Sequence, residues 1–280
     1  MTKSPKRLGR LFVKLVAAAI IVIGSMLVRR WKKIPLAAKR LKILDVPIDP
    51  VTMPVALDRI HEFIQSGKPH HIFTADASGI MQAQQDPALC DIIKQADLVT
   101  ADGAGVMIAS RLGGAALPER VSGVDLVQKV SGLAAANGYS VYLFGAAEGV
   151  AQAAADTLQS RFPGLRIAGT RNGYFTEAEE EQIVRQIADA QPDALFVALG
   201  IPKQEKFIRK HFTELGVPVM IGIGGSFDVI SGKLQRAPRW MQRAGLEWLY
   251  RFAQEPSRLP RLAALPNFIL AAWRSRSRAL

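Results

Sequence analysis

The fold class follows from a stretch that reads ALFVALGIPKQE from Ala194 to Glu205. Its first six residues are apolar, which is typical of a short strand buried on both faces of a sheet. A glycine, a proline and polar residues come next and indicate a loop at the end of that strand. The stretch therefore predicts one unit of an α/β fold.

Five further runs share this pattern. Each is short and apolar, and alanine-rich or charged segments with the period of a helix separate them. Together the six runs predict an α/β fold with a Rossmann-like parallel sheet flanked by helices. The expected strands are residues 71–75, 98–100, 140–144, 167–170, 194–199 and 219–223.

Polar or glycine-rich residues follow nearly every expected strand. Ligands of parallel sheets bind beyond the carboxyl ends of the strands, and glycine there lets backbone N–H groups approach a phosphate. A single loop of this kind also suits a helix cap, but five in register indicate one shared pocket. The candidate binding glycines are Gly145, Gly200, Gly224 and Gly225.

Several site classes are not indicated. Gly145 and Gly149 lack the G-x-G-x-x-G spacing of a dinucleotide site, which disfavours a nicotinamide oxidoreductase. No Asp-x-Asp pair follows a strand, and the four histidines do not cluster with Cys90, so we expect neither a metal site nor a cofactor. A single cysteine excludes an intramolecular disulfide and fits a reducing, cytosolic compartment.

The net charge of +12 is concentrated at the two ends of the chain. Residues 1–42 hold 12 Lys/Arg and no Asp/Glu, and residues 233–280 hold 10 Lys/Arg and 2 Asp/Glu. The interval between them carries a net charge of −8. Bases beside apolar residues at the termini favour anionic membrane lipids as a partner. Nucleic acid is not expected, because a protein that binds it usually carries its bases on the folded body.

The N-terminal segment contains an apolar run at residues 11–28, interrupted only by Lys14. At ~1.5 Å per residue, 18 helical residues reach about 27 Å, just under a hydrocarbon core of ~30 Å. Bases flank the run on both sides. The sequence leaves two interpretations open: a single membrane span, or a basic helix lying at the interface.

The C-terminal segment predicts an amphipathic helical appendage. Pro238 suits a first helical turn, and apolar residues from Trp240 to Phe252 then recur with helical spacing, with arginines along the adjoining face. Glu255-Pro256 breaks this run, and apolar character resumes at residues 268–273. Tryptophan beside arginine favours a surface at the level of lipid headgroups over a helix merely packed on the domain.

Several motifs closely resemble those of the WecG/TagA/CpsF glycosyltransferases. The resemblance extends over about residues 44–270, with the motifs in the expected order. They are TADG (100–103), PERVSGVD (118–125), GIPKQE (200–205), RAP (236–238), EWLYR (247–251) and QEPSR (254–258).

The resemblance implies an activity and its partners. The chain would be an inverting, metal-independent glycosyltransferase at the cytoplasmic face of the bacterial inner membrane, held peripherally or by a single span. Its donor would be a UDP-sugar, most typically of N-acetylmannosamine or its uronic acid. Its acceptor would be polyprenyl-diphosphate-linked N-acetylglucosamine, in the synthesis of a cell-surface polysaccharide. The sequence leaves a homo-oligomer open.

The resemblance also implies roles for individual residues. Asp102 would be the general base, a role that a positioned carboxylate can fill, although Asp102 also suits a helix cap before Gly103. Thr74 and Gln204 would line the substrate pocket. Asp76 stands where the family usually has Asn, which bears on donor choice. The residues expected to meet phosphate are Arg120 and the acceptor-diphosphate arginines Arg251, Arg258 and Arg261.

Two other functions compete with this interpretation. A transferase of the same family using UDP-glucose would make exopolysaccharide, and a membrane-tethered nucleotide-binding module would bind UDP without transferring a sugar. For the glycosyltransferase that the resemblance implies, the expected organisation is a membrane-anchor or interfacial segment at 1–42, a glycosyltransferase α/β domain at 43–232, and at 233–280 an appendage that binds membrane and acceptor diphosphate.

Overall fold

The computed structural model describes residues 39–114, 116–254 and 259–276. All of the described residues belong to one compact unit, which begins at Pro35. The apolar run at residues 11–28 lies outside the described residues.

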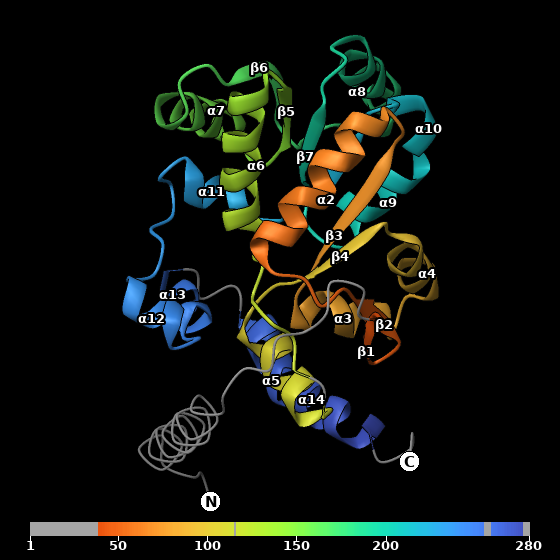
Figure 1. Ribbon diagram of the computed structural model, residues 1–280, viewed down its shortest axis with the longest axis vertical. Coiled ribbons are helices and arrows are strands. Elements are labelled where there is room, and N and C mark those ends of the chain that lie inside the picture. The colour runs from red at the N-terminus through yellow and green to blue at the C-terminus, as the bar shows by residue number, and fades with distance from the viewer. Residues whose placement is uncertain (1–38, 115, 255–258, 277–280) are drawn as a thin grey trace, which may run out of the picture. The chain divides into compact units, whose positions relative to one another are not determined.

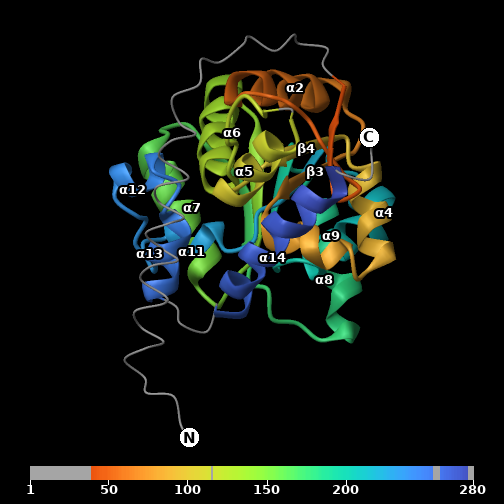
Figure 2. The same ribbon diagram turned by 90° about the horizontal axis from the view of Figure 1, so that it is seen from below.

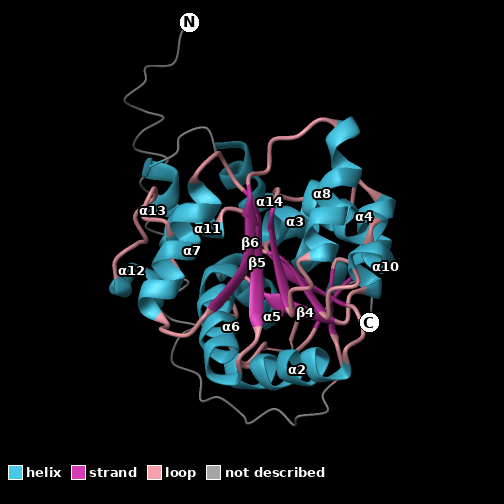
Figure 3. Cartoon of the chain, turned by 90° about the horizontal axis from the view of Figure 1, so that it is seen from above, coloured by secondary structure: helices cyan, strands magenta, loops and turns pink. Residues whose placement is uncertain are grey.

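The centre of the described fold is a six-stranded sheet in the order β4-β3-β8-β7-β5-β6. Every neighbouring pair is parallel, so the predicted parallel sheet is confirmed. All six expected strands are present, with ends shifted by one residue or less (Figures 1 and 3). They are β3 (His70–Ala75), β4 (Leu98–Ala101), β5 (Ser140–Gly145), β6 (Arg166–Arg171), β7 (Ala194–Ala198) and β8 (Val219–Gly222).

Alternate residues of these strands enter different hydrophobic clusters on the two faces of the sheet. Ile72, Leu143 and Phe196 pack in one cluster with α2 (Met53–Ser66), α6 (Gly123–Asn137), α7 (Val150–Arg161) and α11 (Ser226–Ile230). Figure 2 shows α6, α7 and α11 gathered together on that side.

The opposite face is covered in two parts. Phe73 and Val99 pack with α3 (Ala77–Ala83), α4 (Pro87–Gln95), α5 (Ala104–Leu112) and α14 (Leu259–Arg276). Tyr142, Leu195 and Val197 pack with α8 (Glu177–Asp189), α9 (Lys203–Lys210) and α10 (Phe212–Leu215). Helices thus cover both faces of the sheet, which explains why its inner strands β8, β7 and β5 are almost continuously apolar. The edge strand β6 is only partly buried.

A hairpin of β1 (Leu41–Ile43) and β2 (Val46–Ile48) precedes the sheet, and the sequence pattern did not predict it. Its turn residues, Leu44 and Asp45, have φ of 48° and 64°. Two adjacent positive φ values are those of the tight turn that suits a two-residue hairpin. Strands of three residues are too short to show a period, and neither turn residue is the glycine that usually marks such a turn.

The C-terminal residues form three described helices, of which two lie in the expected run from Pro238 to Phe252 and the third follows it. The expectation of unbroken spacing was wrong, because α12 (Arg239–Arg243) and α13 (Glu247–Gln254) are separated at Gly245, whose φ is 71°. A residue in the left-handed region cannot continue a helix.

The third of these helices, α14, packs on α3 and α5, with Phe268 fully buried. Trp240 on α12 and Trp273 on α14 are 65% and 54% exposed. Among the described helices, none has the length and apolar character to cross a bilayer.

Candidate active site

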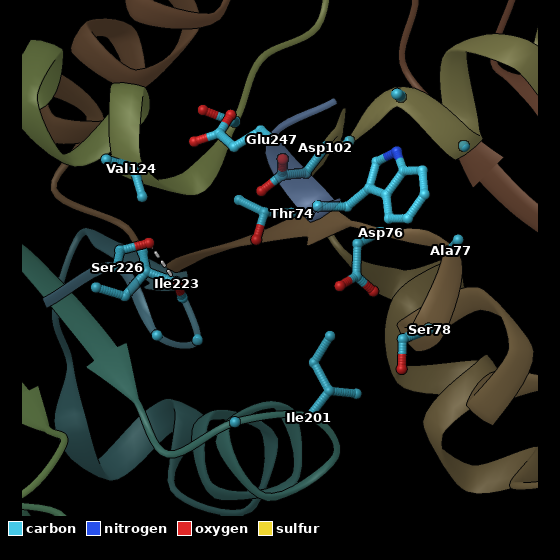
Figure 4. Close-up of a pocket in the computed structure, with 18 of the residues that line it drawn as sticks. Thr74, Asp76, Ala77, Ser78, Asp102, Val124, Ile201, Ile223, Ser226 and Glu247 are labelled. Carbon is cyan, nitrogen blue, oxygen red and sulfur yellow. Dashed lines mark hydrogen bonds between the residues drawn. The ribbon is translucent and has the colours of Figure 1, made fainter. Parts of the chain in front are cut away.

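A cavity of about 430 Å³ opens at the carboxyl ends of β3, β4, β7 and β8. Residues of α13 and α14 complete its wall. In Figure 4, Thr74 and Asp102 lie between Asp76 and Ser78 at one side and Ile223 and Ser226 at the other. The position agrees with the rule that ligands of parallel sheets bind beyond the carboxyl ends of the strands.

The cavity brings together most of the residues singled out from the sequence. Gly145 is the exception among those described, since it does not line the cavity. It ends β5 beside Ala198 of β7, so closely that a Cβ would collide with the Ala198 backbone, and this packing accounts for a glycine there. The expected residues found in the wall are Thr74, Asp76, Asp102, Arg120, Gly200, Gln204, Gly224 and Gly225.

Asp102 follows β4 directly and is held from two sides. Its backbone N–H donates to the carbonyl of Ala75 at 2.8 Å, and its Oδ2 accepts from the N–H of Gly123 at 2.9 Å. Gly123 is the first residue of α6, where an N–H lacks a partner within the helix. The N-cap of α5 is Gly103 and not Asp102. The carboxylate is therefore fixed at the cavity by a contact with a different helix.

Asp76 follows β3 and caps α3. Its Oδ1 accepts from the N–H of Gly79 at 2.6 Å. The amide oxygen of an asparagine can make the same cap. The negative charge of Asp76 is thus not required by the helix that it begins, although it lies in the wall of the cavity.

Gln204 joins two loops of the cavity. It is 1% exposed and sits in the first turn of α9. Its Oε1 accepts from the N–H of Gly200 at 3.1 Å and from the N–H of Gly224 at 3.0 Å. These two glycines belong to the loops that follow β7 and β8, so one side chain fixes the distance between the loops.

Arg120 lines the cavity within a group of four charges. Its Nη1 donates to Glu247 Oε2 at 2.8 Å. Arg236 donates twice to Asp125, at 2.6 and 2.8 Å, and through Nε to Glu247 at 3.3 Å. Two guanidinium groups thus bridge two carboxylates and tie α13 to the first turn of α6.

The charges of this group reinforce one another. Burial opposes ionisation of Asp125, but hydrogen bonds from Arg236 and Ser122 outweigh it and lower the pKa of the Asp125 carboxyl. Burial likewise opposes the charge of Arg236, yet Asp125 and Glu247 raise the pKa of its guanidinium. Both groups are therefore charged at neutral pH.

Sequence reasoning gave no role in the cavity to several residues of its wall, although two of them belong to the EWLYR motif (247–251). Glu247, Trp248 and Phe252 all lie on α13, and the pattern of that helix favoured a surface at the lipid headgroups. Trp248 and Phe252 are four residues apart and so share one helix face, which was the available signal. Nothing in the sequence indicated that this face would meet the ends of β3 and β4.

The acceptor-diphosphate arginines cannot be placed in this geometry. Arg258 lies outside the described residues, and the side chains of Arg251 and Arg261 are likewise not described. Within the described ranges, no three His, Cys, Asp or Glu side chains are grouped so that they could hold a metal ion.

Comparison with known proteins identifies relatives over most of the chain. Residues 41–280 match the family described as "Glycosyl transferase WecG/TagA/CpsF family". A protein of Bacillus subtilis (strain 168) is 37% identical over 199 residues, which cover 71% of this chain and 77% of that protein. One of Staphylococcus aureus (strain MW2) is 34% identical over 232 residues, covering 82% and 91%. Both are named N-acetylglucosaminyldiphosphoundecaprenol N-acetyl-beta-D-mannosaminyltransferase.

Proposed function

Since the chain belongs to the WecG/TagA/CpsF family of glycosyl transferases, we propose that it transfers N-acetylmannosamine, or its uronic acid, from a UDP-sugar to polyprenyl-diphosphate-linked N-acetylglucosamine. The names of the Bacillus and Staphylococcus relatives support this acceptor and the neutral sugar. The observation that carries the proposal is the cavity, whose wall contains both Asp102 and the glycine loops that follow β7 and β8.

In this reaction Asp102 is the general base. A hydroxyl of the acceptor sugar attacks the anomeric carbon of the donor, its proton passes to the Asp102 carboxylate, and the bond from that carbon to the UDP oxygen breaks with its electron pair. Attack from the face opposite UDP inverts the anomeric configuration. A carboxylate positioned in this way contributes about 10²–10⁴-fold to the rate.

The departing UDP gains negative charge that the described wall can offset only in part. Among the described lining residues, four carboxylates (Asp76, Asp102, Asp228 and Glu247) face one guanidinium, that of Arg120. Further positive charge is therefore needed for the two diphosphates, that of UDP and that of the acceptor, to bind together at this cavity. We assign Arg251, Arg258 and Arg261 to the acceptor diphosphate, which leaves Arg120 and backbone N–H groups to meet the charge of UDP.

We place the enzyme at the cytoplasmic face of the bacterial inner membrane, where a polyprenyl acceptor is available. The basic ends of the chain and the exposed Trp240 and Trp273 support peripheral contact with anionic lipid. In the proposed organisation, residues 1–42 associate with the membrane, residues 43–232 hold the donor, and residues 233–280 meet membrane and acceptor diphosphate.

The test is mass spectrometry of the product formed from synthetic N-acetylglucosaminyl-diphospho-polyprenol. Parallel reactions contain UDP-N-acetylmannosamine, its uronic acid, or UDP-glucose. We expect a disaccharide with one of the first two donors. A product formed with UDP-glucose alone would contradict the proposed donor, and UDP binding without transfer from any donor would indicate a binding module in place of an enzyme.

A further inference from the structure

Three buried polar side chains form a chain from β3 to the loops of the cavity. His71, Gln204 and Glu205 are 4%, 1% and 0% exposed. His71 Nε2 lies 2.6 Å from Glu205 Oε2, and Gln204 Nε2 donates to Glu205 Oε1 at 2.8 Å. Burying a carboxyl group as completely as that of Glu205 destabilises a fold unless hydrogen bonds satisfy it. The two hydrogen-bond partners of Glu205 therefore indicate what it does in this fold.

The hydrogen bonds of these three side chains converge on Glu205. The Oε1 of Gln204 accepts from the N–H groups of Gly200 and Gly224, which can only donate. The Nε2 end of the amide must then point away from the loops, and Glu205 accepts from it. The second oxygen of Glu205 lies 2.6 Å from His71 Nε2, and we assign His71 as the donor to it, because both oxygens of a carboxylate can accept. Turning the Gln204 amide around would set N–H against N–H at both loops.

A third part of the cavity is tied to the same chain. The carbonyl of Gly222, at the end of β8, accepts from Thr74 Oγ1 at 2.8 Å. A Cβ on Gly222 would collide with Glu205 and Gln204, so this position has room only for glycine. The orientation of Gln204 thus governs the Gly200 loop, the Gly224 loop and the surroundings of Thr74.

We infer that His71 and Glu205 are positioning residues for glycosyl transfer, and that they act through Gln204. Neither lines the cavity. Glu205 fixes the direction of the Gln204 amide, and His71 supplies the second hydrogen bond that keeps the Glu205 carboxylate in place. The Gly200 and Gly224 loops are then held at the separation at which the sugar donor binds. The identity of that donor rests on the function proposed above.

The test compares His71→Gln with His71→Met. The two replacements are unbranched and of similar length, but only Gln carries an N–H able to reach Glu205. We expect His71→Gln to keep kcat/KM within about threefold of the unsubstituted protein. In His71→Met we expect kcat/KM to fall at least tenfold and the KM for the donor to rise, at an unchanged folded fraction measured by circular dichroism.

Hydrogen exchange gives a readout that does not depend on the substrate. In His71→Met, peptides containing Gly200 and Gly224 should exchange at least tenfold faster, because their amides lose a fixed acceptor, and in His71→Gln they should be unchanged. Absence of transfer by the unsubstituted protein would contradict the proposed function and leave this comparison intact.

Should His71→Met not fold, His71→Asn replaces it, because Asn is polar but too short to reach Glu205. Equal effects of the donating and non-donating variants, whether both are normal or both impaired, would overturn the inference. So would a loss of activity that only follows the folded fraction with an unchanged KM.

Discussion

Asp102 gives the most direct test of the chemistry. Asp102→Asn removes the basic oxygen but keeps an oxygen that can accept from the Gly123 N–H. We therefore expect turnover to fall about 10²-fold or more, with UDP affinity largely unchanged, as measured by steady-state kinetics and titration calorimetry.

The matched control for Asp102 is Asp228→Asn, which neutralises another carboxylate of the same cavity wall. This control tests whether losing any one negative charge of the wall is enough to lower turnover. We expect Asp228→Asn to change turnover by less than about fivefold. Near-normal turnover by Asp102→Asn would remove Asp102 from the role of base.

Asp76 is expected to influence which donor is used. Asp76→Asn keeps an oxygen that can accept from the Gly79 N–H and so cap α3. Its free energy of unfolding should therefore stay within about 0.5 kcal/mol of that of the unsubstituted protein. Loss of a negative charge beside the cavity should favour a donor that carries a uronic acid. We expect the ratio of kcat/KM for the UDP-linked uronic acid to kcat/KM for the UDP-linked neutral sugar to rise roughly fivefold. This corresponds to removing about 1 kcal/mol of repulsion between two negative charges.

Asp76→Ala is the control for that effect. It removes the same charge, so it should shift donor preference in the same direction, but it also loses the cap and should destabilise the fold by about 1 kcal/mol. An unchanged donor ratio in both variants would show that Asp76 serves α3 alone.

Single residues of the site were predictable to different degrees. Thr74, Asp102 and Gln204 follow or lie near the ends of apolar runs, where the position of a ligand can be read from the sequence. Glu247 and Trp248 come from a helix more than 120 residues further along the chain than Asp102 and its loop, and only tertiary packing brings them to the cavity. The bond between His71 and Glu205 was equally unpredictable: Glu205 belongs to the GIPKQE motif, but only the fold brings His71, 134 residues earlier in the chain, next to it.

The contact of α13 with α6 depends on the group formed by Arg120, Asp125, Arg236 and Glu247. Arg236→Met keeps most of the side-chain length but removes the two hydrogen bonds that Arg236 donates to Asp125. We expect the free energy of unfolding to fall by about 2 kcal/mol at pH 7, as measured by urea denaturation.

This loss should depend on pH in a defined direction. The folded-state pKa of Asp125 is lowered, so its contribution is fully present above the unfolded value of about 3.9 and is lost as pH falls through the lower folded value. The difference between Arg236→Met and the unsubstituted protein should therefore shrink in denaturation below about pH 3.9. A difference that is constant with pH would mean that Arg236 stabilises through packing.

Arg185→Met provides the control, because Arg185 is 69% exposed and its nearest carboxylate, on Glu181, is 3.9 Å away. An exposed ion pair of this kind contributes about 0–1 kcal/mol to the free energy of unfolding.

Helices and strands were predicted best where the period was long enough to read. Five of the six strands of the sheet are buried almost throughout and β6 is partly buried, and their apolar runs gave ends correct to one residue. The β1–β2 hairpin escaped because three residues cannot show alternation. The break between α12 and α13 escaped because Gly245 was read within a helical spacing, although glycine with positive φ is a common helix end.

At the level of the whole enzyme, we predict that activity persists in excess EDTA. The sequence contains no Asp-x-Asp pair after a strand, and the charge of UDP is expected to be met by arginine and backbone N–H groups. The measurement is transfer after exhaustive dialysis against EDTA, with and without added Mg²⁺ or Mn²⁺. Complete loss of transfer that either ion restores would reveal a metal requirement.

Membrane attachment and acceptor binding should be separable in this chain. The structure shows where an N-terminal deletion should end: Arg40 donates to the carbonyls of Ala96 and Asp97, and β1 starts at Leu41. Deleting residues 1–34 thus spares the folded body. The deletion should weaken the free energy of binding to anionic vesicles, measured by flotation, by about 1 kcal/mol for each base that had been near lipid. It should leave transfer to a short, water-soluble acceptor intact.

The contrasting variant replaces Arg251, Arg258 and Arg261 with alanine in the full chain. If these arginines hold the acceptor diphosphate, transfer to the short acceptor should fall even though no membrane is present, since each charge-assisted contact contributes about 1.5–3 kcal/mol. The matched control is Arg239→Ala with Arg274→Ala, which removes C-terminal charge outside the described wall of the cavity. A residue that holds the diphosphate is needed whether or not the acceptor is in a membrane. If the triple variant floats less with vesicles but turns over the short acceptor normally, these arginines contact lipid alone.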